Sequence, residues 1–141
     1  IGRVLASHNN CRELVPNQRQ FTDEQIKAII NRDGVIGSAL DAWMLHPNWI
    51  RGKSQPEMVS LSNVTEHIDH VCQLAGTTRH AAIGSDLDGG YGTEQTPLDL
   101  NTIADLQKLQ GLLTKKGYSK TDVESIFHSN WIRFYTEVLK E

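Results

Sequence analysis

Three short runs of small and apolar residues alternate with two amphipathic stretches in the first 90 residues. The apolar runs cover residues 2–7, 35–40 and 81–85, and each is short enough for a buried strand. Between them, residues 22–34 and 60–76 repeat apolar positions at helical spacing. Strands that alternate with helices favour right-handed βαβ units and a parallel sheet, so the pattern predicts an α/β fold.

Local signals support the first of these helices. Thr22 is a good N-cap, Gln25 completes a capping box, and Phe21 and Ile26 occupy the positions of a hydrophobic staple. Gly34 is suited to the turn that ends the helix. We therefore expect a helix that begins at Thr22 and ends at Gly34.

The rest of the chain divides into one long loop and further helices. Residues 41–58 contain two Pro and two Trp without a clean period, and a loop of this length is more often functional than idle. Residues 103–117 predict a third helix, and residues 119–141 predict one or two more, capped by Ser119 or Thr121.

Composition narrows the class of protein without identifying it. The 141 residues have the length of one ordinary domain, and 14 basic residues are outnumbered by 17 acidic ones, which argues against a nucleic-acid partner. No apolar run approaches the length of a membrane span, and the sequence indicates no compartment. Cys11 and Cys72 could pair, but two reduced thiols are the simpler interpretation.

Polar side chains that can bind a cation follow each predicted strand. His8 follows the first strand, Asp41 the second and Asp86 the third, and Gly89 and Gly90 then allow a sharp turn. Ligand sites of parallel sheets lie at the carboxyl ends of the strands. Because a carboxylate there is costly to desolvate, we expect Asp86 to face a metal, a substrate ammonium group or an Arg, and we expect it to lie close to His8.

Other interpretations of the Asp86 segment remain open at this point. An EF-hand is excluded, because the loop position that requires Glu is occupied by Pro97. The segment also resembles the nucleophile motif of haloacid dehalogenase-type phosphatases, with Asp86 as nucleophile and Asp88 as acid. Asp86 and Asp88 could also simply cap a turn and a helix start.

The remaining candidates have structural explanations as well. His8 could be a hydrogen-bonded structural residue, and Arg19, in the loop after it, could be an ordinary surface charge. His67 and His70 share one helix face, but that helix lies away from the strand ends. We therefore expect these two histidines to form a solvated face and not a metal site.

Taken together, four separated motifs resemble the membrane (renal) dipeptidase family, peptidase family M19. In chain order they are ASHNNCRELVPNQRQFTDEQIKAI, SLSNVTEHIDHVCQLAG, AAIGSDLDGG and KKGYSKTDVESIFHSNWIRFY. The resemblance implies an amidohydrolase-like (β/α)₈ TIM barrel that hydrolyses dipeptides with two zinc ions. It further implies that His8 is a zinc ligand, that Arg19 binds the substrate carboxylate, and that Asp86 contacts the substrate amino group and transfers protons.

The resemblance also implies that much of the site is missing from these residues. An HxD pair, a Glu that bridges both metals and two further His have no counterpart here. We therefore expect residues 1–141 to be the carboxyl-terminal part of the barrel, with strands six to eight, and to be inactive alone. Helices on one side of three strands would leave a face uncovered, so we expect self-association or a missing amino-terminal half. The alternative is a non-catalytic half-barrel that acts only by association.

Overall fold

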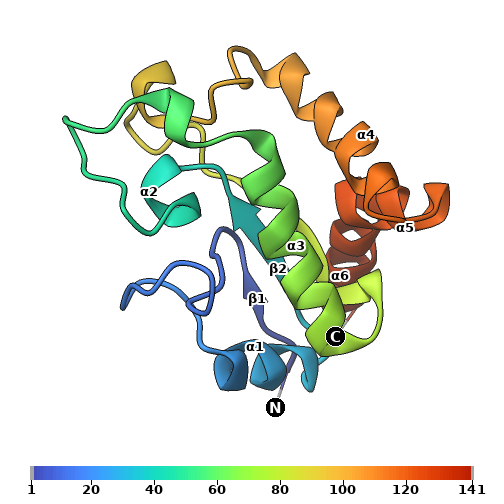
Figure 1. Cartoon of the computed structure of the whole chain (residues 1–141). Helices are drawn as coiled ribbons and strands as arrows, with labels where there is room; N and C mark the ends of the chain where they lie inside the picture. The colour runs from blue at the N-terminus through green and yellow to red at the C-terminus, as the bar shows by residue number, and fades with distance from the viewer. Residues whose placement is uncertain (1, 141) are drawn as a thin grey trace.

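The computed structural model describes residues 2–140, which form a three-stranded parallel sheet with helices around it (Figure 1). The strands are β1 (Leu5–Ala6), β2 (Val35–Ala39) and β3 (Ala81–Ser85), in the order β1-β2-β3. All five residues of β2 are buried, as expected for the central strand. The predicted α/β class and parallel pairing are confirmed.

Helices follow each strand. The α-helices are α1 (Asp23–Ile30), α2 (Ala42–Leu45), α3 (Leu61–Ala75), α4 (Lys108–Lys115), α5 (Lys120–Glu124) and α6 (Asn130–Val138). The capping box predicted for α1 is present, because Thr22 accepts from the backbone of Gln25 and Gln25 reaches back to Thr22. Ser119 caps α5 in the same way, through Asp122.

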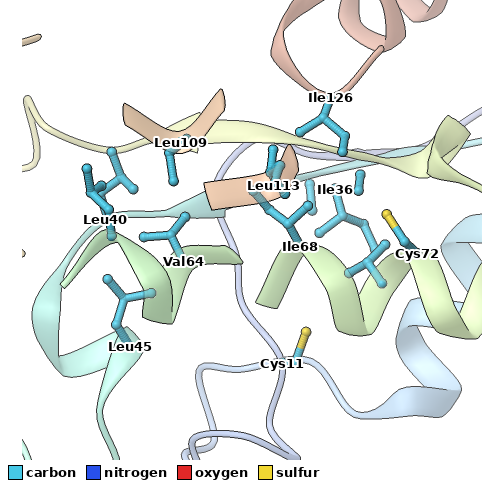
Figure 2. Packing of buried hydrophobic residues seen from close by; sticks show 14 of the residues in the cluster. Cys11, Ile36, Leu40, Leu45, Val64, Ile68, Cys72, Leu109, Leu113 and Ile126 are labelled. Atoms are coloured by element: carbon cyan, nitrogen blue, oxygen red, sulfur yellow. The ribbon is translucent and has the colours of Figure 1, made fainter. Parts of the chain in front are cut away.

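One face of the sheet packs against α1 and α3. Ile36 and Leu40 contribute to this core from the sheet side, and Val64 and Ile68 contribute from α3 (Figure 2). The helix α4 adds Leu109 and Leu113, both fully buried. Cys11 and Cys72 are free and buried, so the prediction of two reduced thiols is confirmed. Burial raises the pKa of the Cys72 thiol to about 11, which makes it unreactive.

The opposite face is covered by α6, and the expectation of helices on one side only was wrong. Phe134 of α6 packs against Val35 and Ala82, which alternate with the core residues facing α3. The indole N–H of Trp131 donates to the carbonyl oxygen of Ile83 at 3.0 Å. The last helix therefore buries apolar strand residues that three strands and two outer helices would leave exposed.

Two glycines let the three strands approach closely just below the predicted site. A Cβ on Gly84 would lie 2.3 Å from the carbonyl oxygen of Ser7 and 2.7 Å from the backbone of Gly37. A Cβ on Gly37 would lie 2.4 Å from the same Ser7 oxygen. These contacts are far shorter than van der Waals separation, so only glycine fits at either position.

An ion-pair cluster connects the beginnings of the strands to α6. Asp33, in the turn before β2, accepts hydrogen bonds from Arg3, Arg79 and Arg133. Arg133 also pairs with Glu137 at 3.2 Å. Asp33 has a left-handed backbone with φ of 50°, a conformation that Asp and Asn tolerate better than most residues. The cluster links four segments that are far apart in the sequence.

Several boundaries differ from those predicted. The strand expected over residues 2–7 is only Leu5–Ala6, and the helix expected over residues 103–117 begins as a 3₁₀ turn before α4. A π-helical turn, Ser125–Ser129, joins α5 to α6, and Glu141 of the predicted last helix lies outside the described residues. Among residues 2–140, no helix has both the length and the apolar character that crossing a bilayer requires.

Candidate active site

The strand ends bring His8 and Asp86 together. His8 lies two residues after β1, Asp86 directly follows β3, and β2 separates the two strands. The imidazole Nε2 of His8 lies 3.9 Å from Oδ1 of Asp86. The predicted proximity is therefore confirmed. Because this separation exceeds hydrogen-bond length, the two atoms form no hydrogen bond with each other and both can contact another partner.

The orientation of His8 is fixed from one side of its ring. The Ser7 hydroxyl lies 2.8 Å from Nδ1 of His8, and the N–H of Asn9 donates to the carbonyl oxygen of Gly37 at 2.8 Å. These contacts hold the residue at the end of the strand while Nε2 faces Asp86. The His8 side chain is 40% exposed, so a ligand can reach it.

Asp86 is presented by an irregular strand end. The register between β2 and β3 shifts at Gly84, and Ser85 and Asp86 both adopt left-handed backbones with φ of 59° and 66°. Two such non-glycine residues cost of order 1–3 kcal/mol each and persist where the surroundings impose them. The N–H of Gly89 donates to the carbonyl oxygen of Asp86 at 2.9 Å, which closes the predicted turn.

Arg19 lies beside His8. Its Nη2 donates to the carbonyl oxygen of His8 at 3.2 Å, and its backbone N–H donates to Oδ1 of Asn17 at 2.9 Å. The side chain is otherwise exposed at the strand ends. The loop after β1 thus delivers a cation to the same region as the imidazole and the carboxylate.

A fourth strand-end group, Asp41, is the centre of a polar cluster that sequence reasoning missed. Its buried carboxylate accepts from the indole N–H of Trp43 at 2.7 Å, from Gln95 at 2.8 Å and from Arg51 at 3.3 Å. Burial raises the pKa of Asp41, and the hydrogen bonds oppose that shift. The sequence gives the position of Asp41 at a strand end, but its partners Arg51 and Gln95 lie in two different loops.

Negative charge collects around these strand ends. Burial raises the pKa of the Tyr91 phenol, and the carboxylates of Asp41, Asp86 and Asp88 raise it further. The phenol oxygen is buried and has no hydrogen-bond partner among the described residues. Three carboxylates at one edge of the sheet favour a cation there.

Comparison with known proteins identifies the family. The sequence model of the membrane dipeptidases, peptidase family M19, matches residues 3–140. The chain belongs to this family. A Klebsiella pneumoniae protein encoded in the pqqA 5′ region is 30% identical over 138 residues, which cover 98% of this chain and 48% of that protein. The dipeptidase AclJ of Aspergillus oryzae is 27% identical over 135 residues, covering 96% of this chain and 30% of its own length.

Solved structures agree with the family. A metallopeptidase of Rhodobacter sphaeroides, bound to a phosphinate mimic of the dipeptide L-Ala-D-Ala, superposes with a TM-score of 0.78 at 27% identity. The match covers 92% of this chain and 34% of that one. An amidohydrolase of Pseudomonas aeruginosa has the same fold, with a TM-score of 0.83 at 22% identity over 99% of this chain and 47% of its own.

The family match settles two of the open points. The chain spans no more than about half the length of these relatives, so its α/β units correspond to part of the dipeptidase barrel. A dipeptidase match over residues 3–140 also leaves no support for the phosphatase interpretation of Asp86 and Asp88.

A complete metal site is not formed by these residues alone. Within residues 2–140, no three His, Cys, Asp or Glu side chains gather closely enough to hold a metal ion. A catalytic zinc ion takes three protein ligands, whereas His8 and Asp86 are two groups. The names of the similar metallopeptidase structures imply a metal ion, and residues 2–140 do not supply a complete set of ligands for one.

The expectation of a solvated face was wrong for His67. His67 is buried, and its Nδ1 accepts the backbone N–H of Cys11 at 3.1 Å. Burial lowers the pKa of His67 to about 4, so the ring is neutral and can accept this bond. His70 pairs with Asp23 at 2.8 Å. The loop after β1 and helix α1 cover this face of α3, which is why it is not solvated.

Proposed function

We propose that this chain is the carboxyl-terminal part of a metal-dependent dipeptidase barrel, with β1, β2 and β3 as strands six to eight. The observation that carries the proposal is the meeting of His8 and Asp86 at the strand ends, in a chain whose family match runs over residues 3–140. Relatives named dipeptidases and a metallopeptidase bound to a dipeptide mimic support hydrolysis of dipeptides as the reaction.

His8 is the metal ligand of this chain. Its Nδ1 is engaged by Ser7, so Nε2 is the nitrogen left to coordinate, which is the usual division of roles in a metal-binding imidazole. We assign two zinc ions to the whole protein, with the remaining ligands supplied by residues other than these 141. The short coverage of the longer relatives supports that assignment.

Asp86 is the proton-transfer group. Its carboxylate is 24% exposed and held by a strained strand end, which suits a group that must reach the reacting atoms. It accepts a proton as water attacks the amide and returns that proton to the leaving amine. Before it takes up that proton, the same carboxylate also pairs with the ammonium group of the substrate.

Arg19 binds the terminal carboxylate of the dipeptide. One N–H is used on the carbonyl oxygen of His8, which orients the guanidinium and leaves further donors for a bidentate contact. A cation beside the residue that supplies the metal ligand favours substrates whose carboxylate lies one residue from the cleaved bond, that is, dipeptides.

The test uses the protein expressed from the complete reading frame that contains these residues. We expect it to hydrolyse Ala-Ala dipeptides, to lose activity on chelation and to regain it with zinc. Residues 1–141 purified alone should bind fewer than two zinc ions and show no turnover. If the complete protein binds no metal and cleaves no dipeptide, the proposal fails and the non-catalytic alternative takes its place.

A further inference from the structure

A cavity of about 330 Å³ opens beside the proposed carboxylate-binding arginine. It is lined by Asn17, Trp43, Trp49 and Arg51, which come from the loops that follow β1 and β2. Asn17 also accepts the backbone N–H of Arg19. The cavity therefore adjoins the backbone of Arg19, the residue proposed to hold the terminal carboxylate of a dipeptide.

The cation in this cavity is the Arg51 guanidinium, and Asp41 and Trp43 hold it in place. Nη2 of Arg51 donates to the buried carboxylate of Asp41, and its guanidinium carbon lies 5.2 Å from the centre of the Trp43 ring. Trp43 donates to the same carboxylate oxygen through its indole N–H. Asp41 therefore orients both the cation and the aromatic surface that supports it.

The outer side of this cation is open. The Arg51 side chain is 64% exposed although it is anchored to a carboxylate that is only 4% exposed. An exposed guanidinium that a buried carboxylate anchors is suited to an anionic oxygen ligand.

We infer that this cavity gives the enzyme a preference for dipeptides whose carboxyl-terminal residue is Asp or Glu. The inference rests on the proposed function, because Arg19 must hold the terminal carboxylate next to the cavity. A residue with two carboxylates then meets two arginines, Arg19 at the backbone end and Arg51 at the side-chain end.

The test compares Ala-Asp with the isosteric Ala-Asn, with both configurations of the second residue, on the protein from the complete reading frame. A charge-assisted hydrogen bond predicts kcat/KM for Ala-Asp about 10-fold to 100-fold above that for Ala-Asn. In Arg51→Gln this ratio should fall to near one, and in Arg51→Lys it should be partly kept. Lys53→Gln removes an exposed charge from the same loop outside the cavity and should leave the ratio unchanged.

A binding measurement separates this inference from the proposed function. Tryptophan fluorescence titrated with N-acetyl-aspartate should saturate at lower concentration than with N-acetyl-asparagine, and Arg51→Gln should abolish the difference. If the ratio of kcat/KM for Ala-Asp to that for Ala-Asn were the same in the wild type and in Arg51→Gln, the inference would be overturned, and the proposal of dipeptide hydrolysis would be unaffected. If no dipeptide is cleaved, the proposed function fails, and the fluorescence titration alone decides whether the cavity prefers an acidic ligand.

Discussion

Replacing Gly84 by Ala should damage the site through the backbone without touching any functional side chain. The new Cβ would lie 2.3 Å from the carbonyl oxygen of Ser7, about 1 Å short of van der Waals contact. The Ser7 oxygen and the Gly37 atoms, which would lie 2.7 Å away, belong to the backbone and cannot rotate out of the way. Ser7 directly precedes His8, and Gly84 lies two residues before Asp86, so the displacement moves the two site residues apart. We expect a loss of about 3 kcal/mol in stability and about 10²-fold or more in kcat/KM.

The assay pairs urea unfolding with dipeptidase kinetics, and Gly111→Ala serves as the matched control. A Cβ on Gly111, in the exposed face of α4, would have nothing within 4 Å. Because Ala is the better helix former, Gly111→Ala should stabilise the protein by up to about 1 kcal/mol and leave turnover unchanged. If Gly84→Ala were as stable and as active as Gly111→Ala, the close approach of the strands would not position the site.

Three further predictions concern single side chains. Asp86→Asn should leave the zinc content nearly intact and lower turnover by about 10² to 10⁴; unchanged turnover would return Asp86 to a turn-capping role. Arg19→Ala should mainly raise KM, because the Arg19 guanidinium pairs with the substrate carboxylate equally in the ground state and in the transition state. A collapse of kcat at constant KM would refute that role. Hydrogen bonds from Arg79 lower the pKa of the Asp33 carboxyl in the folded protein. The ionised carboxylate therefore stabilises the fold at pH values above its pKa in the unfolded chain, about 3.9, and this stabilisation is lost as the pH falls through the lower pKa of the folded state. Asp33→Asn should therefore destabilise the protein by about 1 kcal/mol at pH 7, a figure discounted for its partial exposure, and urea unfolding should show the difference shrinking at low pH.

The elements that local chemistry determines were the ones the sequence predicted well. The capping box of Thr22 and Gln25 and the continuous apolar run of β2 depend on residues close in the chain, and both are observed. The first strand is shorter than predicted, because its ladder with β2 includes only Leu5 and Ala6.

The parts that sequence reasoning missed depend on contacts between distant segments. His67 was expected at the surface, but the loop that carries Cys11 folds over it. The cluster around Asp41 joins Arg51 and Gln95, which are 44 residues apart in the sequence, and no local spacing indicates that they meet at one carboxylate. The position of α6 on the second sheet face likewise follows from tertiary packing.

Zinc content per chain tests most directly whether these residues supply one metal ligand to a dipeptidase site. The measurement compares His8→Ala with His128→Ala, an exposed histidine whose Nδ1 also pairs with a neighbouring serine hydroxyl, Ser129 at 3.0 Å. In the protein from the complete reading frame, we predict two zinc ions in the wild type and in His128→Ala, and about one in His8→Ala with loss of dipeptidase activity. Full zinc content and full activity in His8→Ala would contradict the assignment of His8 as a metal ligand.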